Sequence, residues 1–145
     1  MGKILLIEDN GILADEIKKE LGNEHEIVEA YSYITAIGAW RKNNEQFVCI
    51  ILDLDIKTDG LEEDEIKNHY RTHGILVLEK FCKGKEPDQK KEIWEKTIVY
   101  SAYTDKLEGK EEMKNAPSQP ILIPKGPNSI FKLVRDVKKI MDKKS

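Results

Sequence analysis

The sequence lacks the features of secreted and membrane proteins. Its N-terminal apolar run, Ile4–Ile7, is far shorter than a membrane span and is followed at once by acids. It also lacks the hydrophobic region and cleavage site of a signal peptide. Cysteine is scarce, with Cys49 inside an apolar run and Cys82 in a charged stretch, so no disulfide framework is expected. These absences favour a soluble protein of the reducing cytoplasm.

An excess of basic charge is also missing. The chain has 24 lysine and arginine residues against 27 aspartate and glutamate residues, so no basic field points to nucleic acid or to a membrane surface. The sequence contains no internal repeat, low-complexity tract or Gly/Ser linker. Its 145 residues fit one domain over 1–145, and we expect no DNA-binding or catalytic output domain within them.

The most informative stretch is the apolar run Phe47–Leu52. It is too short for a typical helix and rich in strand-forming residues, which predicts a strand buried on both faces, as in a parallel sheet. The run stops at Asp53, and a second acid follows at Asp55. Ligands of open α/β sheets bind at the carboxyl ends of the strands, so an acid there is placed for chemistry. Alternatively, Asp53 merely ends a strand or caps a turn.

Strand and helix patterns alternate along the whole chain. A helix is predicted from an Asn10 cap to Gly22, with Ile12, Leu13, Ile17 and Leu21 at helical spacing on its apolar face. A second helix around Trp40 should end in the polar turn Lys42–Asn44, and a last helix should be capped by Asn128 or Ser129. This alternation predicts a doubly wound, five-stranded parallel sheet with helices on both faces. The predicted strands are Ile4–Ile7, Glu26–Ala30, Phe47–Leu52, Thr97–Tyr100 and Ile121–Ile123.

The connection over residues 56–96 is unusually long and densely charged. A helix from Leu61 to Cys82 would be roughly 30 Å long, more than five short strands can cover, so part of the connection should project from the core. Of its aromatic residues, we expect Phe81 and Trp94 to fold back on the body and Tyr70 to be partly exposed.

Two further stretches give weaker signals. Pro87 suits the start of a short helix, and residues 105–115 predict at most a short or mobile one. His69 and His73 are four residues apart, as metal ligands on one helical face can be, but no third ligand accompanies them. We therefore interpret them as surface histidines.

Five polar residues end the predicted strands. In a parallel sheet these residues meet at one edge, where three crowded carboxylates would need a cation such as Mg²⁺. A lysine and a hydroxyl nearby are what a transferred phosphoryl group needs, and a free aspartate can accept it as an aspartyl phosphate. The residues are Glu8, Asp9, Asp53, Ser101 and Lys125.

The pieces KILLIEDN, IILDLD, IVYSA and ILIPKGP, in this order, resemble the CheY-like receiver domain of bacterial two-component response regulators. The resemblance implies that Asp53 is the phosphoacceptor and that Glu8, Asp9 and Asp53 bind Mg²⁺ with the backbone carbonyl of Asp55. It also implies that Ser101 is the switch hydroxyl and that Lys125 pairs with the phosphoryl group. The implied partners are a sensor histidine kinase or phosphotransfer protein and an unidentified downstream protein.

Three features depart from the family pattern. Gly126 stands between Lys125 and Pro127 where the family has Lys-Pro, and Leu122 replaces the aromatic switch residue. The third departure is the enlarged connection between the third and fourth strands. Two glycine-containing pieces within it, around Gly60 and Gly74, each match the family's turn into the third helix, and the sequence does not choose between them.

Two other functions are consistent with parts of the sequence. Asp53-Leu54-Asp55 also resembles the nucleophile motif of haloacid-dehalogenase-type phosphatases, but Lys57 stands where that motif has Thr or Val, and the Glu8-Asp9 pair precedes the lysine instead of following it. A receiver-like binding module that never carries phosphate is the third possibility. We favour the receiver, which is a signalling phosphoacceptor and not an enzyme beyond its own phosphorylation and dephosphorylation.

Overall fold

The computed structural model describes residues 2–43 and 46–144, and within them the chain forms a five-stranded parallel sheet. The strand order is β2-β1-β3-β4-β5, which confirms the doubly wound parallel sheet that the alternating pattern predicted. The bounds of the strands differ from the predicted ones by one residue at most. They are β1 Lys3–Ile7, β2 Glu26–Ala30, β3 Phe47–Leu52, β4 Thr97–Ser101 and β5 Ile121–Pro124.

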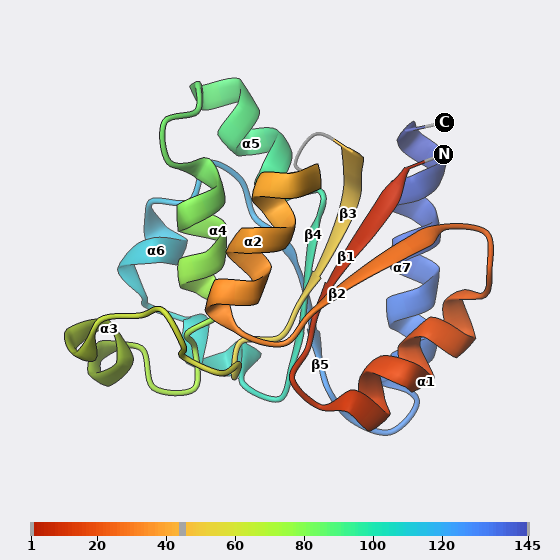
Figure 1. Ribbon diagram of the computed structural model, residues 1–145, viewed down its shortest axis with the longest axis horizontal. Coiled ribbons are helices and arrows are strands. Elements are labelled where there is room, and N and C mark those ends of the chain that lie inside the picture. The colour runs from red at the N-terminus through yellow and green to blue at the C-terminus, as the bar shows by residue number, and fades with distance from the viewer. Residues whose placement is uncertain (1, 44–45, 145) are drawn as a thin grey trace.

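Helices cover both faces of the sheet (Figure 1). On one face α2, α4 and α5 pack over a large apolar core, and on the other α1 and α7 pack over a smaller one. A single-turn 3₁₀ helix, η2, and the short α6 connect β4 to β5. The bounds are α1 Gly11–Leu21, α2 Tyr33–Asn43, α3 Glu63–Asn68, α4 Ile75–Cys82, α5 Pro87–Glu95, η2 Thr104–Leu107, α6 Glu111–Lys114 and α7 Ser129–Lys144.

The central strand β3 is buried on both faces because its side chains alternate between the two cores. Ile50 and Leu52 point into the core under α2 and α4, whereas Cys49 and Ile51 point into the core under α1 and α7. Burial raises the pKa of the Cys49 thiol to about 12, which is the behaviour of a structural cysteine. The apolar run therefore forms the buried parallel strand that the sequence predicted.

The turn after β1 begins α1 where the sequence placed it. The side chain of Asn10 accepts hydrogen bonds from the backbone N–H groups of Ile12 and Leu13, and Gly22 ends the helix with a φ of 78°. One expectation was wrong. Ile12 was assigned to the apolar face of this helix, but its side chain is exposed, and Ala14 packs into the core instead.

The prediction of one helix over Leu61–Cys82 was wrong. The segment breaks into α3, which has no buried residue, and α4, whose residues are mostly buried. One continuous helix would have to expose α4 or bury the charged α3. Figure 1 shows α3 at the periphery of the molecule, so the expectation that part of this connection projects from the core is confirmed.

Gly74 explains where α4 begins. Its N–H donates a hydrogen bond of 2.8 Å to the carbonyl oxygen of Leu54, which brings the start of α4 against the end of β3. A Cβ atom at Gly74 would overlap the carbonyl oxygen of Asp53 and lie 2.9 Å from the Cα of Leu54. The piece around Gly74 is therefore the turn into the helix that covers the sheet, and the extra residues precede it.

The aromatic residues of this connection lie as expected. Phe81 and Trp94 are buried, and Phe81 stacks on Trp40 of α2 with ring centroids 4.2 Å apart. Tyr70 is 66% exposed, which is the partial exposure that we predicted.

The two histidines near the break do not lie as expected. His73 is buried, and its Nε2 lies 2.9 Å from the carbonyl oxygen of Ile66. His69 is half-buried, with its Nε2 3.2 Å from Glu112 Oε1 of α6. Neither is a surface residue, because the turn between α3 and α4 folds them inward.

Two further helix predictions agree with the structure. Pro87 begins α5, and residues 105–115 form only short turns of helix, as predicted. The polar turn expected to end at Asn44 falls partly outside the described residues. Among the helices of the described part of the chain, none has the length and apolar character needed to cross a membrane.

The close contact at Gly74 predicts a large effect of a small substitution. Gly74→Ala should destabilise the protein by about 2 kcal/mol, because the added methyl group has to push the end of β3 away. Gly38→Ala is the matched control, since a Cβ at this α2 position meets no atom within 4 Å and alanine favours helix. Urea unfolding of both variants measures the difference, and an equally mild Gly74→Ala would contradict this explanation.

Candidate functional site

Three carboxylates meet at the carboxyl edge of the sheet. Glu8 and Asp9 follow β1, and Asp53 follows β3, which pairs directly with β1. One carboxylate oxygen from each lies within 4.8 Å of the others. Glu8 and Asp53 are buried and Asp9 is exposed, so the cluster has a buried floor and one side open to solvent.

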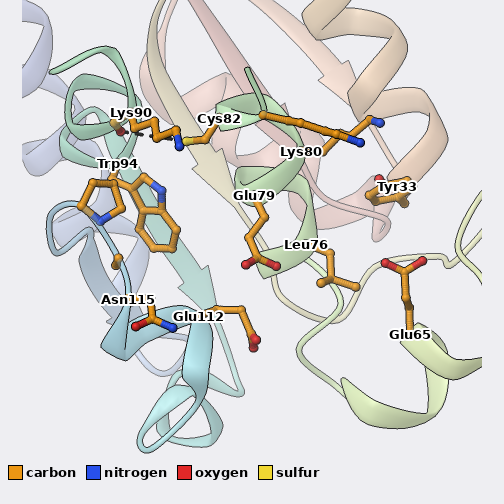
Figure 2. A pocket seen from close by; sticks show the side chains of 13 residues that line it. Tyr33, Glu65, Leu76, Glu79, Lys80, Cys82, Lys90, Trp94, Glu112 and Asn115 are labelled. Atoms are coloured by element: carbon orange, nitrogen blue, oxygen red, sulfur yellow. Dashed lines mark hydrogen bonds between the residues drawn. The ribbon is translucent and has the colours of Figure 1, made fainter. Parts of the chain in front are cut away.

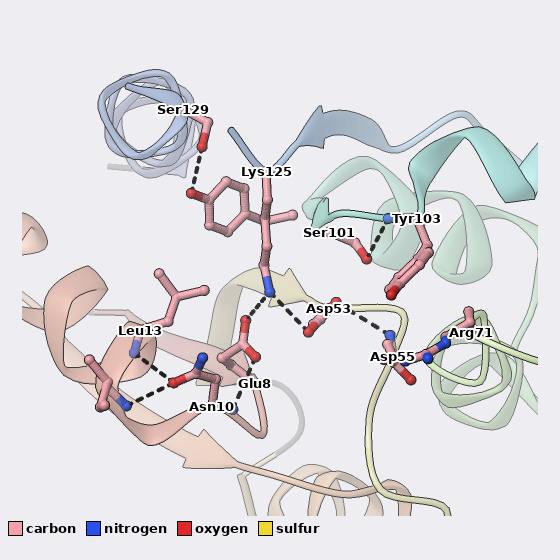
Figure 3. Close-up of polar contacts among 12 residues, drawn as sticks. Glu8, Asn10, Leu13, Asp53, Asp55, Arg71, Ser101, Tyr103, Lys125 and Ser129 are labelled. Atoms are coloured by element: carbon pink, nitrogen blue, oxygen red, sulfur yellow. Dashed lines mark hydrogen bonds and ion pairs between the residues drawn. The ribbon is translucent and has the colours of Figure 1, made fainter. Parts of the chain in front are cut away.

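Lys125 reaches this cluster from the last strand. Its Nζ donates hydrogen bonds to Glu8 Oε1 at 2.7 Å and to Asp53 Oδ2 at 3.1 Å (Figure 3). Its backbone N–H donates to the carbonyl oxygen of Ser101, which ties the residue after β5 to the end of β4. The side chain therefore joins Glu8 and Asp53 across the edge of the sheet, as the predicted convergence required.

Burial and like charge shift the ionisation of the acids. Burial and the neighbouring Asp53 carboxylate raise the pKa of Glu8 to about 7, and the contact with Lys125 offsets only part of that rise. Burial, with the charges of Asp53 and Asp55, also raises the pKa of Asp9. Although burial lowers the pKa of Lys125, the charges of Asp53 and Glu8 outweigh it and raise that pKa above its ordinary value.

Ser101 lies at the end of β4 with its side chain buried. Its Oγ accepts a hydrogen bond from the backbone N–H of Tyr103 at 3.2 Å (Figure 3). The hydroxyl thus lies on the same edge of the sheet as the acids, while its described hydrogen bond goes to the chain that follows it.

Asp55 contributes through two groups. Its backbone N–H donates to Asp53 Oδ1 at 3.3 Å, and its carboxylate accepts a hydrogen bond of 2.7 Å from Arg71 Nη1. Sequence reasoning missed Arg71, since it placed this residue within a continuous helix and no local pattern links positions 16 residues apart. The only signal was the acid at Asp55, close to three other acids and in need of a cation.

The donor set fits a hard divalent cation. Carboxylate oxygens are the ligands that Mg²⁺ takes in proteins, and Mg²⁺ retains several waters, which the exposed side of the cluster at Asp9 allows. The raised pKa values of Glu8 and Asp9 reduce their negative charge, and Lys125 adds a positive charge beside them. An anion can therefore bind next to the metal. The residues can therefore hold a metal and an anion together.

A hollow of about 520 Å³ lies beside α4, and none of the edge-cluster residues lines it. Figure 2 shows Glu65 of α3, Glu79 of α4 and Glu112 of α6 around it. Burial and the charge of Glu112 raise the pKa of Glu79, and His69 opposes that rise. The hollow lies among α3, α4, α5 and α6, away from the edge cluster.

Two of the departures from the family pattern, at Gly126 and Leu122, lie on or next to β5. Ser129 Oγ accepts a hydrogen bond from the N–H of Gly126 and donates one to its carbonyl oxygen, and it lies 2.7 Å from the hydroxyl oxygen of Tyr100. The loop after Lys125 is thereby fastened to β4 and α7 despite the extra glycine. Leu122 is exposed on β5.

The raised pKa of Glu8 predicts a pH-dependent stability in the absence of metal. The folded pKa of about 7 exceeds the ordinary value of 4.5, so the stability that protonated Glu8 gives is complete below 4.5 and is lost as the pH rises through 7. Glu8→Gln should resemble the unmodified protein at about pH 5 and exceed its stability by on the order of 2 kcal/mol at about pH 8.

Urea unfolding in the presence of a chelator measures this difference. Glu20→Gln, at an exposed position of α1, is the control and should show no such dependence on pH. An equal effect of Glu8→Gln at both pH values would contradict the assignment.

Comparisons with known proteins agree with this fold. No protein-family model matches the sequence, and a search of curated proteins finds no match. Among solved structures, the Francisella response regulator 1452 receiver domain aligns with a TM-score of 0.67 and 20% identity, covering 100% of both chains.

The response regulator TrrA of Thermotoga maritima, solved in complex with Mg²⁺ and BeF, aligns with a TM-score of 0.63 and 22% identity over 97% of this chain and 99% of its own. The same protein in complex with the histidine kinase ThkA aligns with a TM-score of 0.64, again with 22% identity and the same coverage. Both likenesses span nearly the whole chain. The fold of this protein is that of the CheY-like receiver domains of response regulators.

Proposed function

We propose that this chain is a phosphorylatable receiver, one domain over residues 1–145, in a two-component phosphorelay. Asp53 accepts a phosphoryl group with the help of Mg²⁺, and the modification changes which downstream protein the domain binds. The observation that carries this proposal is the lysine bridge: Lys125 Nζ contacts both Glu8 and Asp53 within a cluster of three carboxylates. The lysine supplies positive charge for an incoming phosphoryl group, and the carboxylates supply oxygen ligands for a metal.

Glu8, Asp9 and Asp53 would hold the metal through carboxylate oxygens, and Asp55 through its backbone carbonyl. When bound, Mg²⁺ supplies the positive charge that lets an anionic donor approach three acids. Mg²⁺ binding should be of modest affinity because this ion keeps several of its waters.

The chemical step is a transfer to a carboxylate. An oxygen of Asp53 bonds to phosphorus while the bond from phosphorus to the donor breaks, either to a histidine nitrogen of a kinase or phosphotransfer protein or to the oxygen of a small acyl phosphate. Lys125 holds the transferred group as a point charge. Water later attacks phosphorus, which releases inorganic phosphate and regenerates the Asp53 carboxylate.

The receivers of similar fold support the choice of partners. TrrA was solved with Mg²⁺ and BeF and also with a histidine kinase. A histidine kinase or phosphotransfer protein is therefore the class of donor that we propose here.

The second candidate is a phosphatase of the haloacid-dehalogenase type, which also forms an aspartyl phosphate. Lys57 stands where that motif has Thr or Val, and the fold aligns with receivers over nearly its full length. Repeated turnover of ordinary sugar phosphates would favour it over the receiver. The third candidate is a receiver-like module that never carries phosphate. It lacks support because the sequence has all four charged residues of a phosphorylation site, which are Glu8, Asp9, Asp53 and Lys125.

Acetyl phosphate with Mg²⁺ should add one phosphoryl group to the protein, measured by intact mass. Asp53→Asn should abolish the addition, because an amide oxygen is a poor nucleophile. Asp15→Asn, on the exposed side of α1, is the matched control and should be phosphorylated normally. Full phosphorylation of Asp53→Asn would refute the assignment.

Ser101→Ala should interrupt the response of the segment that follows β4. The phosphoryl group brings about −1.5 to −2 charge and strong acceptor oxygens, so we expect the Ser101 hydroxyl to leave Tyr103 and turn toward it. Phosphorylation-induced amide shifts over Ala102–Lys114 should shrink in this variant while Asp53 is still modified. Ser118→Ala serves as the control, and unchanged shifts in Ser101→Ala would contradict this mechanism.

A further inference from the structure

Arg71 has an unusual backbone for its residue type. Its φ is 65°, in the left-handed region that glycine tolerates and a long side chain rarely adopts. It lies in the turn between α3 and Gly74, within the enlarged connection. Such a conformation persists only where the surrounding structure holds it in place, so its contacts are informative.

The side chain of Arg71 joins three segments of the chain. Its Nη1 donates a hydrogen bond of 2.7 Å to Asp55 Oδ2, after β3. Its guanidinium also lies over two aromatic rings, at 5.0 Å from the centroid of Tyr70 and 5.3 Å from that of Tyr103. Tyr103 follows β4, so the guanidinium spans the gap between two loops at the carboxyl edge.

Both loops contact the proposed site through their backbone amides. The N–H of Asp55 donates to Asp53 Oδ1, and the N–H of Tyr103 donates to Ser101 Oγ (Figure 3). One guanidinium therefore holds the two residues whose amides contact the acceptor carboxylate and the switch hydroxyl.

We propose that Arg71 is a positioning residue for the phosphoryl site, holding Asp55 and Tyr103 so that, before phosphorylation, their amides stay on Asp53 and Ser101. This inference rests on the proposed function, and it adds a residue of the enlarged connection to the site. Arg71 acts through its two neighbours and has no described contact with Asp53 itself.

The pairing with Asp55 also has an electrostatic consequence. The negative charge of Asp55 acts on the carboxylate cluster, since it helps to raise the pKa of Asp9. Without Arg71 this carboxylate would be unpaired, and the edge would gain one net negative charge. The added negative charge would weaken the binding of an anionic phosphoryl group but would not weaken the binding of a divalent cation. A general loosening of the fold would instead weaken both.

The test is NMR of ¹⁵N-labelled Arg71→Ala, with Mg²⁺ and beryllofluoride as probes. In the ligand-free variant the amide signals of Asp53, Asp55 and Tyr103 should move together. Beryllofluoride affinity should fall on the order of tenfold, as expected for one uncompensated charge near a partly exposed site, and Mg²⁺ affinity should not fall. Arg71→Lys keeps the charge but loses the planar stack, so it should recover most of the affinity while the Tyr103 amide stays shifted.

Lys18→Ala is the matched control. Lys18 pairs with Glu29 at 3.1 Å with a side-chain exposure of 37%, against 39% for Arg71, and should leave every readout unchanged. Unmoved Asp53 and Tyr103 amides in Arg71→Ala, or equal losses of Mg²⁺ and beryllofluoride affinity, would overturn the inference. An unmodified protein that binds no beryllofluoride in the presence of Mg²⁺ would instead refute the proposed function, and the ligand-free amide comparison would still decide whether Arg71 positions these loops.

Discussion

Repulsion among Glu8, Asp9 and Asp53 is the constraint on which the rest of the site depends. Carboxylate oxygens within 4.8 Å of one another raise the free energy of the folded chain unless positive charge is brought to them. Lys125 brings one charge, and its distances of 2.7 and 3.1 Å to Glu8 and Asp53 require β5 to end at the same edge as β1 and β3. Parallel strands meet that requirement, because all of them point the same way.

The fold was predictable because its strongest signals are local. Phe47–Leu52 has no polar residue, so only a strand covered on both faces can bury it, and the parallel sheet follows from that. Once the sheet is parallel, the edge cluster follows too, since Asp53 and Lys125 each come after a strand. This convergence is why residues up to 117 positions apart could be grouped from the sequence alone.

The errors arose where distant contacts override local pattern. Helical spacing runs without interruption through Leu61–Cys82, yet α3 ends at Asn68, and α4 begins only after Gly74, which must fit against the Asp53 carbonyl oxygen. Arg71 and His73 then lie in a turn, where helical spacing says nothing of their partners. Ile12 was misplaced for a simpler reason: the buried residues Ala14, Ile17 and Leu21 are spaced three and four apart, and Ile12, which does not share that spacing, lies off their face of the helix.

The hydrogen bond from Gly74 to Leu54 has a consequence for how this fold can vary. The chain leaves the sheet at Leu54 and returns to the same point at Gly74, so everything between them forms a closed loop whose ends are fixed. The entropy of closing a loop grows only with the logarithm of its length, so residues can be gained or lost there at little cost in stability. The carboxyl edge of this sheet is thus an attachment point, where new surface can be added while the distance from Asp53 to Lys125 stays the same.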